Sequence, residues 1–213
     1  CFGELLLRLS PDPGTPLDRS DRLDLAVGGA EANVAIALSS LGLPVAMLSA
    51  VADSPTGRRA LAALGEAVFA VADQLAEMLA RDGEGATKFV RVICADATSD
   101  EDAHAIANTV ALSPLVKTAL AASDPNWGRI VAAVGRAPVS EIAIDRVNVW
   151  INDVQIVKNG GRHPEYTEEA GQAAMNPVDI DIRISMGVGS GYCRVMTCDL
   201  TKEYVRINAE YRT

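Results

Sequence analysis

A carboxylate between two glycines is the first group in this sequence that could do chemistry. Glu84 stands in "LARDGEGATKFVRV", residues 79–92, where an apolar helix-like run gives way to a β-rich run. Glycines let the backbone approach a ligand closely, and a carboxylate at such a place can bind an ammonium group. The spacing alone equally indicates a helix end and turn, with Gly83 at the C′ position. The motif leaves both interpretations open.

The cysteines and histidines are the other side chains that could bind a metal or act as nucleophiles. The four cysteines, at positions 1, 94, 193 and 198, form no CxxC pair, and neither His104 nor His163 stands beside a candidate nucleophile. We therefore expect no metal site and no Cys-His or Ser-His pair. Cys94 and Cys193 fall in apolar, strand-like runs, which indicates reduced thiols that pack as small hydrophobic groups.

A glycine-rich segment, "GVGSG" at residues 187–191, could be mistaken for a dinucleotide-binding loop. It lies between two candidate strands and opens no helix, so we predict a hairpin turn. No phosphate-binding GxxxxGK[ST] stretch occurs, and we expect no cofactor.

Composition and charge exclude several classes of partner. The chain has 213 residues, of which 49% are hydrophobic, and a formal net charge of −9. That charge repels phosphate backbones and anionic lipids, so nucleic acid and membrane surfaces are not expected partners. The sequence contains no apolar run of the roughly 18 residues needed to span a bilayer, and no basic leader. We expect a soluble, cytoplasmic protein.

Both helices and strands are predicted around these residues. "FGELLLRLS" predicts a strand, and residues 24–51 predict a βαβ unit with a helix ending at Gly42. A helix is predicted over 56–81, followed by a strand over 86–97. Further along we predict helices in 99–112, 113–123, 124–135 and 164–175, a hairpin in 145–161 around Asn152-Asp153, paired strands in 178–187 and 191–200, and a terminal helix capped by Thr201.

Five ordered motifs carry a resemblance to a known family. From about Ala67 to Thr213 the chain contains "RDGEGATKF", "SPLVKTA", "DPNWGRI", "CDLT" and "YVRINAEYRT". This part resembles the C-terminal β chain of the ornithine acetyltransferase (glutamate N-acetyltransferase) family. The resemblance implies an α+β fold, a layered α/β sandwich, and transfer of acetyl from N-acetylornithine to glutamate through an acetyl-enzyme in arginine biosynthesis.

A different resemblance covers the first residues. "FGELLLRLSP", "VGGAEANVAIALSSLGLPVA" and "DSPTGRRAL" are similar to the N-terminus of ribokinase-class sugar kinases, particularly 2-keto-3-deoxygluconate kinases. We predict a chimera-like chain, with an incomplete sugar-kinase-like βαβ segment at 1–63 and an acetyltransferase-like domain at 64–213. No "GAGD"-type segment, where such kinases keep their catalytic aspartate, is present. A fragment of a sugar kinase is the alternative hypothesis.

The acetyltransferase resemblance assigns three substrate-binding residues. Glu84 matches the family's substrate-binding glutamate, and Asn208 and Thr213 match its two C-terminal substrate contacts. Glu84 would bind the ammonium of an amino acid, while the Asn208 amide and the Thr213 hydroxyl would donate to its carboxylate.

The catalytic residue is not identified. The family's nucleophile is a threonine in an Ala-Thr-Met-Leu type context, which neither Thr15 nor Thr56 matches, and Cys1 leads directly into the kinase-like strand. We therefore expect no acetyl transfer by this chain alone. We expect a complementary α chain, within an oligomer, as the source of the nucleophile. A noncatalytic amino-acid-binding subunit is the third hypothesis.

Overall fold

The computed structural model describes residues 6–10, 13, 24–29, 34 and 54–210. The chain divides into two compact units, Cys1–Glu77 and Met78–Thr213. The division falls inside one helix, α2 (Pro55–Arg81), and so does the predicted domain boundary at 63/64. That boundary therefore remains a prediction. Helix α2 itself confirms the predicted helix over 56–81, and Pro55 begins it at a position where a missing N–H costs nothing.

The first unit contains a pair of short strands. Strand β1 (Leu6–Ser10) pairs antiparallel with β2 (Asp24–Gly28), and Leu6 lies opposite Gly28. Both strands were predicted from their apolar residues. The helix and second strand of the predicted βαβ unit fall in 30–33 and 35–53, which lie outside the described residues.

The second unit is built on a six-stranded mixed sheet with the order β6-β5-β4-β7-β3-β8. Its central strands, β3 (Phe89–Ala97) and β7 (Asp179–Ser185), are parallel, and the other neighbours are antiparallel. Strand β8 (Gly191–Cys198) lies at one edge, and β4 (Asn148–Ile151), β5 (Val154–Lys158) and β6 (Gly161–Arg162) continue the other side. The predicted α+β class is confirmed.

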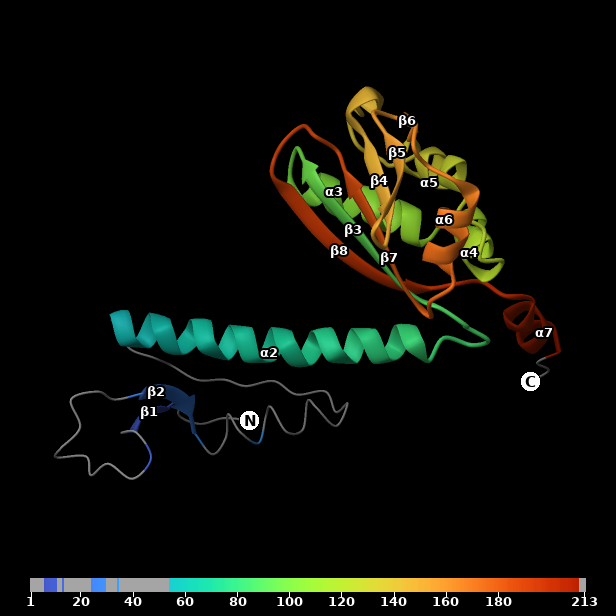
Figure 1. Cartoon of the computed structure of the whole chain (residues 1–213). Coiled ribbons are helices and arrows are strands. Elements are labelled where there is room, and N and C mark those ends of the chain that lie inside the picture. The colour runs from blue at the N-terminus through green and yellow to red at the C-terminus, as the bar shows by residue number, and fades with distance from the viewer. Residues whose placement is uncertain (1–5, 11–12, 14–23, 30–33, 35–53, 211–213) are drawn as a thin grey trace. The chain divides into compact units, whose positions relative to one another are not determined.

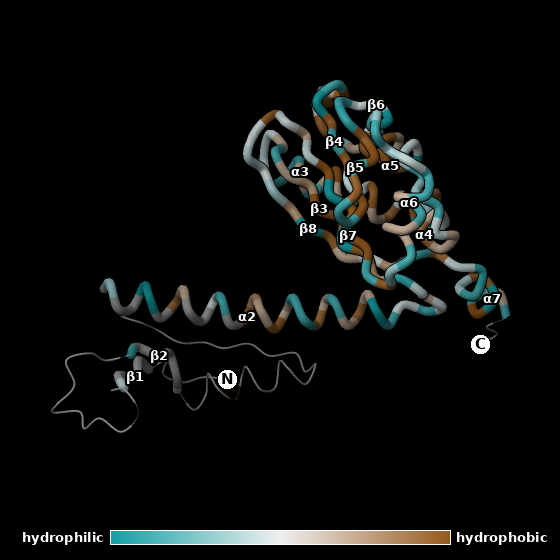
Figure 2. Tube along the Cα trace, in the orientation of Figure 1, coloured by the Kyte–Doolittle hydropathy of each residue, from teal (hydrophilic) through white to brown (hydrophobic). Residues whose placement is uncertain are grey.

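Four helices pack on one face of this sheet (Figure 1). They are α3 (Asp100–Ala111), α4 (Pro114–Ala121), α5 (Trp127–Val134) and α6 (Glu168–Met175). Alternate residues of the central strands face them, because successive side chains of a strand point to opposite faces. The buried side chains on this face include Val90, Val92, Ile180, Ile182 and Ile184. Figure 2 shows the same concentration of hydrophobic residues where strands and helices meet.

Capping residues begin three of these helices. The Ser99 hydroxyl accepts a hydrogen bond from Asp102 N at the start of α3, and Asn126 Oδ1 accepts one from Arg129 N at the start of α5. Thr167 caps α6 in the same way. Each cap satisfies one of the backbone N–H groups that the first turn of a helix leaves unpaired.

The predicted pairing of the last two strands is wrong. Strand β3 lies between β7 and β8, so the segment 186–190 is not a hairpin turn but crosses the end of β3. Val188 N and Gly189 N both donate to Asp96 O, and a Cβ at Gly189 would lie 2.3 Å from Ala97 O. Alternation of polar and apolar residues identifies a strand but not its neighbour, because pairing depends on distant parts of the chain. The predicted hairpin around Asn152 is confirmed by the antiparallel β4–β5 pair.

Two cysteines face each other inside the sheet. Cys94 of β3 lies opposite Cys193 of β8, and both are free thiols. Cys94 is fully buried, and this burial, with smaller contributions from Cys193 and Asp96, raises the pKa of its thiol to about 12. Burial also raises the pKa of Cys193. Cys94 belongs to the buried core and Cys193 packs against it, so both pack as the hydrophobic groups that the sequence predicts.

Candidate functional site

The turn that carries Glu84 connects the end of α2 to strand β3. Asp82 N donates to Met78 O at the helix end, and Ala86 N donates to Gly83 O across the turn. The left-handed conformation falls at Gly85, whose φ is 66°, and not at Gly83, where the C′ position was predicted. Gly83 instead lies against β8, where an added Cβ would be 2.8 Å from Cys198 Sγ. Both glycines thus permit close backbone packing around an exposed glutamate.

The terminal helix brings Asn208 to this turn. Helix α7 (Lys202–Glu210) follows the predicted cap residue Thr201, whose hydroxyl accepts from Tyr204 N. Asn208 Nδ2 donates to Glu84 Oε2 at 2.8 Å and to Tyr204 O at 3.0 Å. The structure therefore places two of the three predicted site residues in direct contact, although 124 positions separate them. Thr213 lies outside the described residues.

The geometry of this pair determines what it can offer a ligand. Both N–H groups of the Asn208 amide are already used, one by a carboxylate and one by a backbone carbonyl. The amide oxygen of Asn208 and the second oxygen of Glu84 then remain as acceptors. Both residues are exposed, so these oxygens can be reached from solvent. A pair of acceptors that includes a carboxylate is suited to an ammonium group.

A buried carboxylate fixes the segment that follows the turn. Asp199 is 3% exposed and accepts hydrogen bonds from Thr87 N at 2.8 Å, Lys88 N at 3.0 Å and the Thr87 hydroxyl at 2.5 Å. The Lys88 ammonium is itself buried and donates to Met175 O and Pro177 O. These contacts join the start of β3 to the end of β8 and to the end of α6. They fix the end of the Glu84 turn next to the segment that leads into α7.

The residues that support the site were not singled out by the sequence. Asp199 and Lys88 belong to the motifs "CDLT" and "DGEGATK", but nothing near them indicates that one would receive hydrogen bonds from a segment about 111 residues away. A single buried acid leaves no local periodic signal. The motifs themselves were the signal that could have found them.

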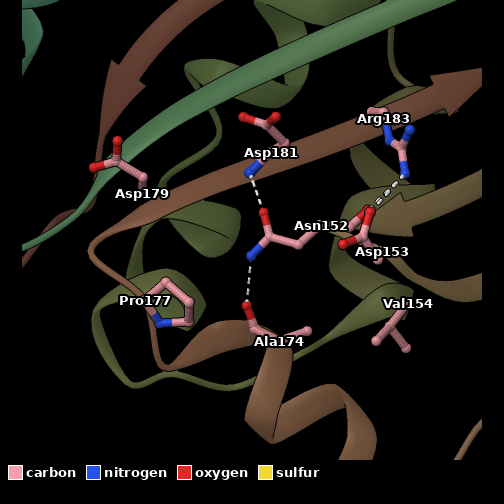
Figure 3. Close-up of a pocket in the computed structure, with 8 residues that line it drawn as sticks. All are labelled: Asn152, Asp153, Val154, Ala174, Pro177, Asp179, Asp181 and Arg183. Atoms are coloured by element: carbon pink, nitrogen blue, oxygen red, sulfur yellow. Dashed lines mark hydrogen bonds and ion pairs between the residues drawn. The ribbon is translucent and has the colours of Figure 1, made fainter.

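A polar hollow, separate from the Glu84–Asn208 pair, lies at the β4–β5 turn (Figure 3). Its volume is about 510 Å³, and the lining includes Asp153, Asp179, Asp181 and Arg183. These charges already have partners in the protein: Asp179 pairs with Arg81 at 2.7 Å, Asp181 with Arg91 at 2.6 Å, and Asp153 lies 3.8 Å from Arg183. Because its charges are compensated internally, the hollow offers a ligand less than the exposed Glu84–Asn208 pair does.

The Arg81–Asp179 pair gives this hollow a defined pH response. The hydrogen bonds from Arg81 lower the pKa of Asp179 below its usual value. A lowered folded-state pKa stabilises the protein above the unfolded-state pKa, and the stabilisation is lost as the pH falls through the folded value. Since both side chains are more than a third exposed, solvent screening keeps the contribution of the pair below about 1 kcal/mol.

Two further observations concern metal ligands and membrane-spanning helices in the described part of the chain. Within residues 6–10, 13, 24–29, 34 and 54–210, no three His, Cys, Asp or Glu side chains converge as a metal site would require. In the same residues, no helix has the length and hydrophobicity needed to cross a membrane.

Comparison with known proteins identifies the class to which this architecture belongs. The model of the ArgJ family matches residues 37–213, and the chain belongs to this family. The pfkB family of carbohydrate kinases also matches, over residues 1–68. The resemblance to the ornithine acetyltransferase family is confirmed, and the kinase-like N-terminus is found as well. The two matches overlap at residues 37–68, a range that includes the predicted junction at 63/64.

Individual relatives agree with this assignment. The arginine biosynthesis bifunctional protein ArgJ of Methylococcus capsulatus is 54% identical over 151 residues, which are 71% of this chain and 37% of that protein. The crystal structure of the ArgJ protein of Bacillus halodurans is 31% identical, with a TM-score of 0.69 over 78% of this chain and 79% of that one. A PfkB family carbohydrate kinase of Listeria grayi is 44% identical over 31% of this chain and 21% of that one, with a TM-score of only 0.30. The chain thus spans little more than a third of the length of the curated relative.

Proposed function

We propose that this chain supplies the amino-acid-binding part of a glutamate N-acetyltransferase site, in which acetyl passes from N-acetylornithine to glutamate. The observation that carries the proposal is the Glu84–Asn208 contact at 2.8 Å, formed by the first and the last of the five family motifs. Each free amino-acid substrate carries an ammonium group, and the pair presents acceptor oxygens to it. Thr213, three residues beyond α7, is the proposed contact for the carboxylate.

The chemical step requires groups that come from elsewhere. Acyl transfer through an acetyl-enzyme needs an activated nucleophile and an oxyanion hole, and no residue of this sequence matches the family's nucleophile context. We propose that a complementary α chain supplies both, in an oligomer in the cytoplasm. The 213 residues alone should therefore give neither N-acetylglutamate nor an acetyl adduct on the intact protein, which mass spectrometry would check.

A calorimetric titration with three ligands tests the proposed function. We expect saturable binding of ornithine and of glutamate by the wild-type chain, because both carry an ammonium and a carboxylate. 2-Keto-3-deoxygluconate has no ammonium and should not bind. Binding of the sugar acid without either amino acid would favour the alternative, a sugar-kinase-like site in the segment that the pfkB model matches. Binding of the amino acids, with no activity after a complementary α chain is added, would favour a noncatalytic subunit.

A further inference from the structure

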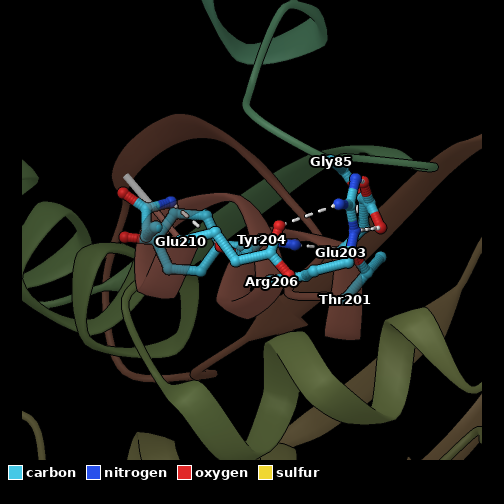
Figure 4. A network of polar contacts seen from close by, with 7 residues as sticks. Gly85, Thr201, Glu203, Tyr204, Arg206 and Glu210 are labelled. Atoms are coloured by element: carbon cyan, nitrogen blue, oxygen red, sulfur yellow. Dashed lines mark hydrogen bonds and ion pairs between the residues drawn. The ribbon is translucent and has the colours of Figure 1, made fainter. Parts of the chain in front are cut away.

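One hydroxyl connects the two halves of the proposed site. Thr201 Oγ1 donates to Gly85 O at 2.6 Å and accepts from Tyr204 N at 3.4 Å (Figure 4). The first bond reaches the residue next to Glu84. The second lies in the first turn of the helix that carries Asn208. Thr201 therefore caps α7 and ties its start to the Glu84 turn.

Gly85 allows the Glu84 turn and the start of α7 to approach each other closely. Its left-handed backbone, with φ at 66°, lies against the first turn of α7, and an added Cβ would be 2.7 Å from Tyr204 N and 3.0 Å from Glu203 Cβ. Turn and helix thus meet backbone to backbone. No side chain could be inserted between them without moving the helix.

The rest of α7 contributes little to its own placement. None of its residues is buried, and its ion pairs, from Arg206 to Glu203 and Glu210, lie within the helix itself (Figure 4). Such pairs stabilise a helix but do not orient it against a neighbour. Among the described residues, the polar contacts that α7 and its cap make with the turn are the Thr201–Gly85 and Asn208–Glu84 bonds.

Because Asn208 lies far along α7 from Thr201, a small change of helix direction at Thr201 displaces Asn208. Asn208 lies seven residues after Thr201, which is two helical turns or about 10 Å along the axis. A tilt of about 10° at the cap would move Asn208 by about 2 Å at that distance. A displacement of that size breaks a hydrogen bond of 2.8 Å.

We infer that Thr201 is a positioning residue, whose hydroxyl sets the geometry of the Glu84–Asn208 pair and thereby its affinity for an ammonium-bearing ligand. This inference rests on the proposed function for its ligand, but the geometry exists without one. Thr201 does not contact the ligand itself. Its effect is transmitted through the start of α7.

Two substitutions of Thr201 distinguish the effect of its hydroxyl from the effect of its side-chain shape. Thr201→Val keeps the branched side chain and removes both hydrogen bonds, whereas Thr201→Ser keeps the hydroxyl. We expect Thr201→Val to weaken ornithine binding roughly tenfold in calorimetry, as loss of one productive hydrogen bond would, and Thr201→Ser to restore it to within about twofold. Thr109→Val is the matched control, because the Thr109 hydroxyl also donates to a backbone carbonyl, that of Ala105 in α3.

A ligand-free measurement accompanies the titration. The side-chain NH₂ signals of Asn208 in a ¹H–¹⁵N spectrum report its bond to Glu84, and Glu84→Ala marks their position without that bond. Thr201→Val should shift these signals toward the Glu84→Ala position, and Thr201→Ser and Thr109→Val should not.

The outcomes distinguish the two claims. Unshifted Asn208 signals in Thr201→Val, or equal losses in the valine and serine variants, would overturn the positioning role. If wild-type protein bound no ornithine, the proposed function would fail. The Asn208 signals would still show whether Thr201 sets the geometry of the Glu84–Asn208 pair.

Discussion

Replacing Glu84 by glutamine should weaken ornithine binding by about 1–3 kcal/mol, or roughly 5- to 150-fold, which is the range for a hydrogen bond to a charged group. Glutamine keeps the size of the side chain and can still accept from Asn208 through its amide oxygen. Its NH₂ group replaces the second carboxylate oxygen, so the negative charge and one acceptor for the ammonium are lost. The melting temperature should change little, because Glu84 is exposed and the turn depends on its glycines. Calorimetry and thermal unfolding measure the two effects separately.

The control for this substitution is Glu210→Gln. Glu210 is an exposed glutamate of α7 that pairs with Arg206 at 3.2 Å, so its replacement changes the net charge by the same amount. Binding should be unaffected in this variant. Equal weakening in both variants would mean that ornithine responds to overall charge, and an unchanged affinity in Glu84→Gln would remove Glu84 from the site.

Replacing Asp199 by alanine should lower the free energy of unfolding by about 2–4 kcal/mol. The backbone N–H groups of Thr87 and Lys88 lose their acceptor, and each unsatisfied buried donor costs about 1–3 kcal/mol. Because the Thr87 bond is only partly buried, we expect the sum in the lower part of the resulting range of about 2–6 kcal/mol. Urea unfolding measures the loss. Asp199→Asn should cost less, since its amide oxygen can still accept from both groups.

Asp153→Ala is the matched surface control for Asp199. Its side chain is fully exposed and lies 3.8 Å from Arg183, so its removal should change the free energy of unfolding by less than about 0.5 kcal/mol. An Asp199→Ala protein as stable as the Asp153→Ala protein would contradict the supporting role of the buried carboxylate.

The helices were predictable from the sequence because their signals are local. Ser99 and Asn126 stand immediately before apolar periodic runs, and each proves to be a cap. The same holds for the hairpin at Asn152, which has a left-handed φ of 50° in a two-residue turn. Such signals depend on residues within one or two turns of chain.

Strand order was not predictable because no local signal determines it. The residues of β7 alternate between polar and apolar, and this pattern identifies a strand without identifying its neighbour. Strand β3 lies between the other two, parallel to β7 and antiparallel to β8. This order depends on how the whole sheet is assembled and not on the sequence of any one strand. The turn prediction for 187–191 failed with it.

The candidate site was predictable only in part. Family motifs pointed to Glu84 and Asn208, and the structure adds their contact and the use of both Asn208 N–H groups. Without the motifs, "DGEG" would read as a turn, which it also is. The hydroxyl of Thr201 was predicted as a cap, but its bond to Gly85 O depends on a fold that joins positions 116 residues apart.

A ¹H–¹⁵N NMR titration with ornithine tests the central claim most directly, because it locates the bound ligand on the chain. If the Glu84–Asn208 pair is the amino-acid site, the amide signals of residues 83–86 and the Asn208 NH₂ signals should shift saturably, with the dissociation constant found by calorimetry. Signals around the hollow at the β4–β5 turn should remain unchanged. Saturable binding that moved the signals of that hollow and left residues 83–86 and Asn208 unaffected would contradict the account.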